Sequence, residues 1–238
     1  MAGVAVKFAA LATDFDGTIA CEGVVERATV DALRRAKAAG MQLLLVTGRE
    51  LASLFNTFAD TAVFDVIVAE NGAVLYRPDS AKVEPLAGPP PPALLEALTR
   101  DKVPFSVGHS IVATVEPYGP QILGAIRALD LAWEVIPNKD ALMALPAGVT
   151  KASGLLHALR TLSIETTRTV GVGDAENDLA LLQVCGLAVA VNNGLPSVKR
   201  IAHVITTGEN GKGTAELIDR LLAGELDTLP VPVLERSS

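Results

Sequence analysis

The chain has 238 residues, of which 50% are hydrophobic, and its formal net charge is −7. This length and apolar content predict a folded protein with a sizeable core. The acidic balance argues against nucleic acid as a partner, because such binding relies on lysine and arginine to neutralise phosphates. The apolar runs are far shorter than the roughly 20 residues of a membrane-spanning helix. We therefore expect neither a nucleic-acid nor a membrane partner.

The sequence predicts a cytoplasmic protein. Its two cysteines, Cys21 and Cys185, are far apart and lack the paired spacing of a zinc site. A secretory signal would have to include the apolar segment that runs into Asp14, where the most informative motif begins. Both features fit a reducing compartment.

The first predicted strand, residues 8–12, is short and apolar and runs into Thr-Asp-Phe-Asp-Gly-Thr at residues 13–18. Such a strand is typical of the buried centre of a parallel sheet. Asp14 and Asp16 are two residues apart, so their side chains share one face and can reach a single small site. Taken alone, the pair is better explained by two loop aspartates in Asx-turns, and the catalytic interpretation becomes preferable only with the partners found further along the chain.

Helices and strands then alternate, which predicts a parallel sheet covered on both faces. The expected elements are a helix at 26–39, a strand at 41–46, a helix at 50–58 and a strand at 66–69. Asn71-Gly72 favours a tight hairpin turn into a further strand at 74–76.

A run of four prolines at 89–92 marks a change of pattern and is typical of a stiff boundary. Beyond it we expect a separate α+β insert with helices at 93–100 and 121–129 and short strands near Phe105, Val112, Val135 and Leu142. The predicted domains are a discontinuous core of residues 1–84 and 149–226, a small insert of residues 85–148, and a loose tail of residues 227–238.

After the insert the alternation resumes, with helices expected at 152–162, 177–184, 196–201 and 214–222 and strands at 169–172, 187–191 and 204–205. Polar groups follow the core strands. Thr47 and Gly48 come after one strand, Asp174 and Asp178 after another, and Lys151 opens the helix that follows the insert. Ligand sites of open α/β sheets lie at the carboxyl ends of strands, so we expect these groups to meet.

Four motifs in this order resemble those of the haloacid dehalogenase superfamily of aspartate-nucleophile phosphotransferases. They are residues 14–18, residues 47–49, Lys151 and residues 173–178. The resemblance extends from about residue 11 to about residue 222 and is closest to the Cof-type branch, subclass IIB, whose cap lies between the second and third motifs. It implies an α/β fold with a Rossmann-like parallel-sheet core and an inserted α+β cap.

The resemblance also implies roles for individual residues. Asp14 would be the nucleophile and Asp16 the general acid and base. Mg²⁺ would be bound by Asp14, the backbone carbonyl of Asp16 and Asp174, with Asp178 supporting its water shell. Residues expected to bind phosphate are Thr47, Gly48, Lys151 and Asn177.

Four further residues are expected near the substrate or the cap, namely Arg49, Asn71, His109 and Asn193. Ordinary structural roles stay open for several positions. Arg49 would instead pair with an acid, and for His109 the role of an ordinary surface histidine is the preferred interpretation. Lys151 would otherwise be a solvated residue at a helix start and Asp174 a helix cap.

The activity implied by the resemblance is that of a magnesium-dependent phosphatase acting on a small phosphorylated metabolite, either a sugar phosphate or phosphoglycolate. The short cap makes phosphoglycolate the first substrate to test, and a monomer or small homo-oligomer is expected. Two alternatives stay open. One is a phosphosugar mutase with the same nucleophile, and the other is a catalytically silent phosphate-binding or regulatory module.

Overall fold

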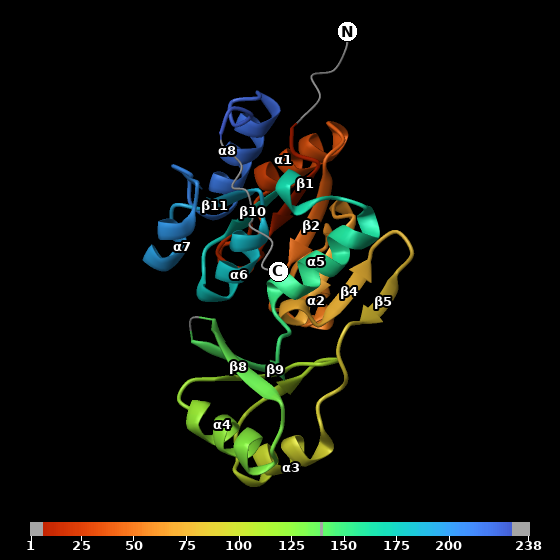
Figure 1. Ribbon diagram of the computed structural model, residues 1–238, viewed down its shortest axis with the longest axis vertical. Helices are drawn as coiled ribbons and strands as arrows, with labels where there is room; N and C mark the ends of the chain where they lie inside the picture. The colour runs from red at the N-terminus through yellow and green to blue at the C-terminus, as the bar shows by residue number, and fades with distance from the viewer. Residues whose placement is uncertain (1–6, 139, 230–238) are drawn as a thin grey trace, which may run out of the picture.

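The computed structural model describes residues 7–138 and 140–229. Its central feature is an eight-stranded sheet of order β12-β11-β10-β1-β2-β3-β4-β5, parallel from β12 to β3 and antiparallel from β3 to β5 (Figure 1). The strands are β1 (Ala10–Thr13), β2 (Gln42–Val46), β3 (Val66–Ala69), β4 (Val74–Arg77), β5 (Lys82–Pro85), β10 (Thr169–Gly173), β11 (Leu187–Ala190) and β12 (Val204–Ile205). The predicted α/β fold with a mostly parallel sheet is confirmed.

Helices cover both faces of this sheet, which explains why its central strands are apolar without alternation. They are α1 (Arg27–Ala38), α2 (Leu51–Thr57), α5 (Lys151–Leu162), α6 (Leu179–Val184), α7 (Pro196–Ile201) and α8 (Asn210–Leu222). Alternate side chains of β2 pack on opposite faces of the sheet. Leu43 and Leu45 join the cluster that contains residues of α1 and α8, whereas Leu44 joins the cluster that contains residues of α5.

A second sheet of order β6-β7-β9-β8 is antiparallel and lies below the first in Figure 1. Its strands are β6 (Ser106–Val107), β7 (Val112–Val115), β8 (Trp133–Asn138) and β9 (Ala141–Pro146), and its helices are α3 (Pro92–Arg100) and α4 (Gly119–Ala128). Leu98 of α3 and Ile122 of α4 pack against Val112 and Ala144 of the sheet. This unit therefore has an apolar core of its own.

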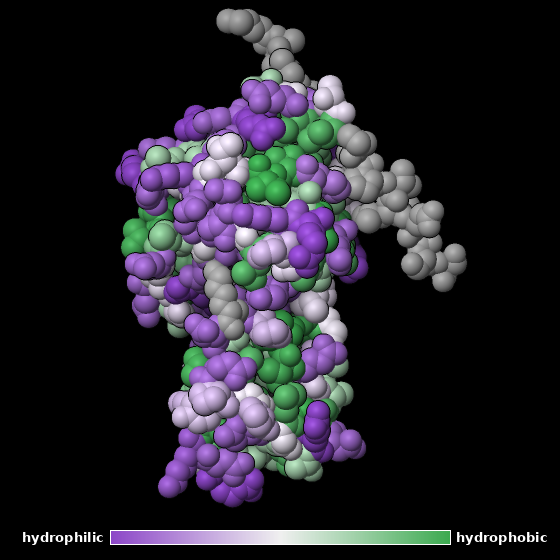
Figure 2. Space-filling view, turned by 90° about the vertical axis from the view of Figure 1, so that its left-hand side faces the viewer, coloured by the Kyte–Doolittle hydropathy of each residue, from purple (hydrophilic) through white to green (hydrophobic). Residues whose placement is uncertain are grey.

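The surface of the lower part is mixed in character. Figure 2 shows that this part is narrower than the part above it and that hydrophobic side chains reach its surface among hydrophilic ones. Val107, Val115 and Leu123 are among its exposed apolar residues. Apolar residues exposed singly are normal on protein surfaces and indicate no docking site.

The main differences from the sequence prediction concern three elements. The edge strand β5 was not predicted, because its residues are mostly exposed and carry no apolar pattern. α8 begins at Asn210 rather than at residue 214, because the backbone N–H of Asn210 donates to Asn193 Oδ1 and fixes the first turn earlier. The helix expected at 177–184 is a 3₁₀ turn, Glu176–Asp178, followed by α6.

The predicted tail falls largely outside the described residues, which end at 229. At its start, Lys7 Nζ donates to the carbonyl oxygens of Asp227 and Leu229. Within residues 7–138 and 140–229, the structure contains no helix of the length and apolarity needed to cross a membrane.

Candidate active site

The loops that follow β1, β2, β3 and β10 meet at the carboxyl edge of the parallel sheet. Register brings the first two motifs and the last into line, because Thr13 of β1 is opposite Leu45 of β2 and Val172 of β10. The backbone N–H of Asp14 donates to the carbonyl oxygen of Val172 over 3.0 Å. Residues that come just after these strands are thereby forced close together.

Lys151 lies at the centre of the site. Its Nζ donates to Asp14 Oδ1 over 2.5 Å and to Asp178 Oδ1 over 2.6 Å. The lysine is 1% exposed, and both carboxylates are buried. A buried charge is tolerated only when it is paired and hydrogen-bonded, which this arrangement provides. Lys151 is therefore an internal partner of the acidic residues and not a solvated residue at a helix start.

Asp14, Asp174 and Asp178 form a compact acidic cluster, each offering a carboxylate oxygen within 4.8 Å of the others. Oxygen ligands of this kind are those preferred by hard divalent cations such as Mg²⁺. A cation would also offset the mutual repulsion of three buried carboxylates. The chemistry of the donor set thus fits magnesium.

The environment changes the proton affinities of Asp14 and Lys151. Burial raises the pKa of Asp14 to about 8, with Asp178 and Asp174 acting in the same direction and Lys151 opposing them. Burial acts to lower the pKa of Lys151, but the carboxylates of Asp14 and Asp178 outweigh it, so the pKa lies above its ordinary value. Lys151 is consequently a fixed positive charge in this site.

Asp178 is held in place by the turn that precedes it. Its Oδ2 accepts the backbone N–H groups of Asp174 and Ala175, while its Oδ1 accepts from Lys151. Gly173 is required here, because a Cβ atom at that position would lie 2.6 Å from the Asp178 side chain. Thr18 adds a brace by donating to Asp174 Oδ1 over 3.1 Å.

The side chain of Asp16 lies outside this acidic cluster. Arg49 holds both of its oxygens, with Nε 2.7 Å from Oδ2 and Nη2 2.7 Å from Oδ1. Arg49 also donates to Thr57 Oγ1, and its guanidinium lies over the Phe15 ring at 5.1 Å. Bidentate arginine–carboxylate pairs fix the orientation of both side chains and are stronger than hydrogen bonds between neutral groups. Of the two interpretations of Arg49 from sequence, the structure shows the ion pair.

The second motif lies against β9. Thr47 is buried, and its Oγ1 accepts the backbone N–H of Arg49 over 3.1 Å. A Cβ atom at Gly48 would lie 2.9 Å from Met143 Sδ and 3.7 Å from Asn177 Nδ2. The four-stranded sheet therefore packs closely on this loop, and Gly48 makes that approach possible.

Asn177 and Asn71 face one another across the site. Asn177 Nδ2 lies 3.3 Å from Asn71 Oδ1, and the backbone N–H of Asn71 donates to the carbonyl oxygen of Thr47. Asn177 Oδ1 is buried and accepts no hydrogen bond from the part of the chain that the structure describes. Both side chains thus border the second and fourth motifs.

His109 and Asn193 have structural partners. His109 Nδ1 lies 3.1 Å from Glu70 Oε1. The histidine therefore links the β6–β7 loop of the second sheet to the β3–β4 connection of the first. Asn193 Nδ2 donates to the carbonyl oxygen of Gly17, and its Oδ1 accepts from the backbone of Asn210. Asn193 therefore braces the loop that carries Asp16.

Sequence reasoning missed two residues that the structure brings to this region. Glu70 is 0% exposed and contacts the loop around His109. The sequence could have indicated Glu70, because an acidic residue directly after an apolar strand lies at the same sheet edge as the motifs. Met143 had no signal, since its approach to Gly48 depends on how the second sheet is placed.

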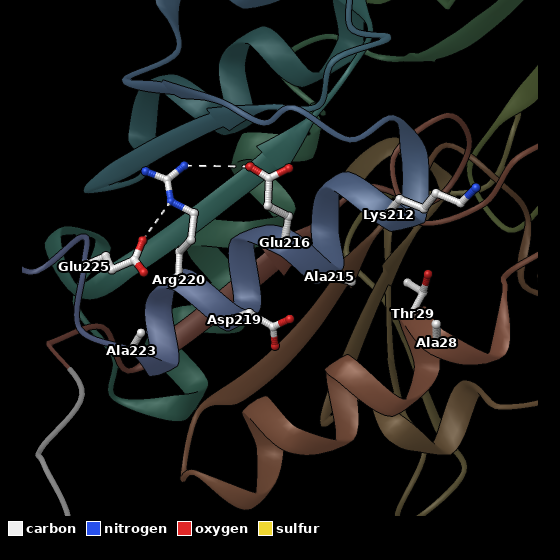
Figure 3. A pocket seen from close by; sticks show the side chains of 9 residues that line it. All are labelled: Ala28, Thr29, Lys212, Ala215, Glu216, Asp219, Arg220, Ala223 and Glu225. Atoms are coloured by element: carbon white, nitrogen blue, oxygen red, sulfur yellow. Dashed lines mark ion pairs between the residues drawn. The ribbon is translucent and has the colours of Figure 1, made fainter.

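A groove of about 650 Å³ lies elsewhere, between α1 and α8 (Figure 3). Its charged side chains are paired with one another or with neighbours. Arg220 lies 4.0 Å from Glu216 and 3.4 Å from Glu225, and Asp219 pairs with Arg35. Locally neutralised charges of this kind give no reason to place a ligand in the groove.

Comparison with known proteins agrees with the geometry. A phosphoglycolate phosphatase of Methanothermobacter thermautotrophicus is 31% identical over 90% of this chain and 98% of its own. Phosphoglycolate phosphatase 2 of Saccharolobus solfataricus is 34% identical over 55% of either chain.

Solved structures share the fold. A haloacid dehalogenase-like hydrolase from Bacteroides thetaiotaomicron superposes with a TM-score of 0.76 at 20% identity, covering 90% of this chain and 99% of its own. A subclass IIB sugar phosphatase gives 0.72 at 19% identity, covering 89% and 98%. The sequence profile of the haloacid dehalogenase-like hydrolases matches residues 11–88 and 135–218. With this match over most of its length, the chain belongs to that family of hydrolases.

Proposed function

We propose that this protein is a magnesium-dependent phosphatase that hydrolyses a small phosphate monoester through an aspartyl-phosphate intermediate. The observation that carries the proposal is the buried arrangement in which Lys151 bridges Asp14 and Asp178 beside Asp174. A carboxylate that attacks an anionic phosphate needs positive charge around the reacting atoms. In this site Lys151 is one fixed positive charge, and the carboxylate oxygens of the acidic cluster would bind Mg²⁺ as a second.

The reaction proceeds in two displacements. In the first, a carboxylate oxygen of Asp14 bonds to phosphorus while the ester oxygen departs and takes a proton from Asp16. In the second, water attacks the phosphorus of the aspartyl phosphate and gives a proton to Asp16. The bond to Asp14 breaks, and inorganic phosphate leaves with the original carboxylate restored.

Other residues bind the phosphoryl oxygens. Lys151 and the Thr47 hydroxyl would contact the oxygens that do not depart, and Asn177 and the backbone of Gly48 border the same space. Asp14, Asp174 and the backbone carbonyl of Asp16 would hold Mg²⁺, with Asp178 supporting its water shell, and the ion would offset charge on the transferred phosphoryl group.

Asp16 must change partners during turnover. Both of its oxygens accept from Arg49 in this structure. A carboxylate whose two oxygens accept from a guanidinium has no proton to give, whereas the acid must present an O–H to the leaving oxygen. We infer that Asp16 leaves Arg49 when it acts as the acid.

Residues 85–148 are proposed as a cap that closes over the substrate and excludes water. Met143 already packs on Gly48, so in this conformation the second sheet covers the second motif. Phosphoglycolate is the proposed substrate class, supported by the names of the relatives that align over most of the chain. Sugar phosphates are the second class to examine.

The test is phosphate release from phosphoglycolate, sugar phosphates and nucleoside monophosphates, with and without Mg²⁺. Asp14→Asn should abolish release, whereas Asp31→Asn, at a half-exposed residue of α1, should not. Isomerisation of a sugar phosphate with little free phosphate would replace this proposal by a mutase. Magnesium binding without turnover of any compound would replace it by a binding module.

A further inference from the structure

Glu70 is a buried charged residue for which the proposed reaction has no use. It directly follows β3, at the edge where the motifs meet, and is 0% exposed. Its φ is +51°, and that of Asn71 is +55°, so two consecutive non-glycine residues adopt the left-handed region. Such residues cost free energy and persist only where the surroundings hold them.

The Glu70 carboxylate is bound by one loop of the second sheet. Its Oε1 accepts the backbone N–H of His109 over 2.9 Å, and its Oε2 accepts that of Ser110 over 2.8 Å. His109 Nδ1 adds a third contact at 3.1 Å. A Cβ atom at Gly108 would lie 2.6 Å from this carboxylate, so glycine is needed for the loop to approach.

The backbone of the same turn is tied to the second motif. The N–H of Glu70 donates to the carbonyl oxygen of Arg49 over 3.0 Å, and the N–H of Asn71 donates to that of Thr47 over 2.9 Å. Glu70 thus joins two structures. Its backbone is fixed to the loop that would bind phosphate, and its side chain is fixed to the loop between β6 and β7.

We propose that Glu70 is a positioning residue that latches the cap loop 108–110 onto the core and so sets how much of the protein is closed over its substrate. Among the described residues, the hydrogen bonds to its carboxylate come from His109 and Ser110. Lifting the cap therefore breaks them together. This inference rests on the proposed phosphatase function, because closure matters only if substrate binds beneath the cap.

The latch can open without stranding a buried charge. A cleft of about 230 Å³ borders Glu70, Gly108 and His109 on the side of α2, so water has a route to the carboxylate once the loop lifts. Water would then donate to the carboxylate in place of the loop N–H groups. The closed state is therefore favoured only by the difference in free energy between the hydrogen bonds to the loop and the hydrogen bonds to water. A contact of this kind can set an equilibrium between open and closed conformations.

The first test follows the latch itself, without any substrate. Hydrogen exchange of the His109 and Ser110 amides is measured in the wild-type chain and in Glu70→Gln. Glutamine offers one acceptor oxygen in place of two, and its NH₂ group would face a backbone N–H. These amides should exchange at least about tenfold faster in the variant, while the amides of β1 and β10 keep their protection.

Gly108→Ala tests the latch from the cap side and leaves the core unchanged. The added methyl group would collide with the Glu70 carboxylate, so the same two amides should lose protection. Gly124→Ala is the matched control, because a Cβ atom there meets nothing within 4 Å. Glu50→Gln is a second control, since among the described residues the hydrogen bond of Glu50 to the second sheet is an exposed one, donated by the Ser106 hydroxyl.

Kinetics then separate positioning from folding. A smaller closed population lowers apparent affinity by the same factor, so KM for phosphoglycolate should rise about tenfold in Glu70→Gln and Gly108→Ala, with kcat changed much less. Protected amides at 109 and 110 in both variants, or faster exchange throughout the core, would overturn the latch. An inactive wild-type protein would refute the phosphatase proposal, while hydrogen exchange would still decide the role of Glu70.

Discussion

Lys151 Nζ and Asp14 Oδ1 are 2.5 Å apart in space, although the two residues are separated by 137 positions in the sequence. The lysine opens α5, and the aspartate follows β1, so the contact exists because β1 ends and α5 begins at the same edge of the sheet. With Asp178 on its other side, the lysine neutralises part of a buried acidic cluster. Stability and proposed catalysis therefore depend on the same contact.

Replacing Lys151 by Met should lower both the stability of the protein and its phosphatase activity. Removing one partner of a buried ion pair costs about 3–5 kcal/mol in the free energy of unfolding, because a charge is left buried without compensation. The kcat/KM for phosphate release should fall about 10²- to 10³-fold, as for the loss of a group that stabilises transition-state charge. Urea unfolding and steady-state kinetics measure the two effects.

Lys82→Met is the matched control for Lys151→Met. Lys82 lies on an exposed edge strand and pairs with Glu84 over 3.4 Å in solvent. Its loss should change the free energy of unfolding by no more than about 1 kcal/mol. Equal stability losses in the two variants would contradict the central role given to Lys151.

Magnesium binding should depend on pH through Asp14. In the metal-free protein the pKa of Asp14 is raised to about 8, mainly by burial, so its carboxyl is protonated below that pH. A cation binds the ionised form, and binding below pH 8 must therefore release a proton. Apparent affinity should rise with pH, by up to about tenfold per pH unit, and level off above pH 8.

Titration calorimetry in two buffers of different ionisation enthalpy measures this proton release directly. Asp14→Asn should bind Mg²⁺ more weakly and release no proton in the same pH range. Binding without proton release, or affinity that does not change with pH, would show that Asp14 is ionised before the metal arrives.

Much of the fold was predictable because its elements carry local signals. Residues 66–69, 196–201 and 204–205 match β3, α7 and β12 to the residue. Each follows an apolar pattern or begins at a proline. β5 has no such signal, since it is an exposed edge strand that exists by pairing with β4.

The site was predictable in part for the same reason. Motifs that follow parallel strands must converge, which places Asp14 near Asp178, and Lys151 joins them because α5 begins at the same edge of the sheet. Hydrogen-bond partners cannot be found in this way. Asp16 faces Arg49 across 33 positions, and His109 faces Glu70 across 39, and neither pairing follows from strand order.

Gly48 and Met143 should be coupled in a double-mutant cycle. Alanine at residue 48 would place its Cβ 2.9 Å from Met143 Sδ, and such overpacking costs about 1–3 kcal/mol. Gly48→Ala should therefore lower kcat/KM, and Met143→Ala in the same chain should restore part of it. A coupling free energy of about 1 kcal/mol or more is expected for a direct contact.

Gly88→Ala serves as the control in this cycle, because nothing lies within 4 Å of a Cβ atom at that position. Its kcat/KM should equal that of the wild-type chain. Additive effects of Gly48→Ala and Met143→Ala would mean that the second sheet does not press on the second motif during turnover.

Asn193 should support activity without touching phosphate. Its Nδ2 donates to the carbonyl oxygen of Gly17 over 2.7 Å, and its Oδ1 accepts from Asn210 N over 2.7 Å, which ties the Asp16 loop to the start of α8. Asn193→Ala loses both bonds and should lower kcat as well as stability. Asn193→Asp keeps the acceptor for Asn210 but places a carboxylate oxygen against the Gly17 carbonyl.

The two variants should therefore differ in stability but not in kcat. Asn193→Asp is expected to retain more stability than Asn193→Ala in urea unfolding, since each net hydrogen bond contributes about 0.5–1.5 kcal/mol. Its kcat should nevertheless be as low as that of Asn193→Ala, because the Gly17 contact that positions Asp16 is lost in both. Asn192→Ala, at an exposed neighbour, should leave both quantities unchanged. Full kcat in Asn193→Asp would show that the link to α8, and not the Gly17 contact, is what positions the loop.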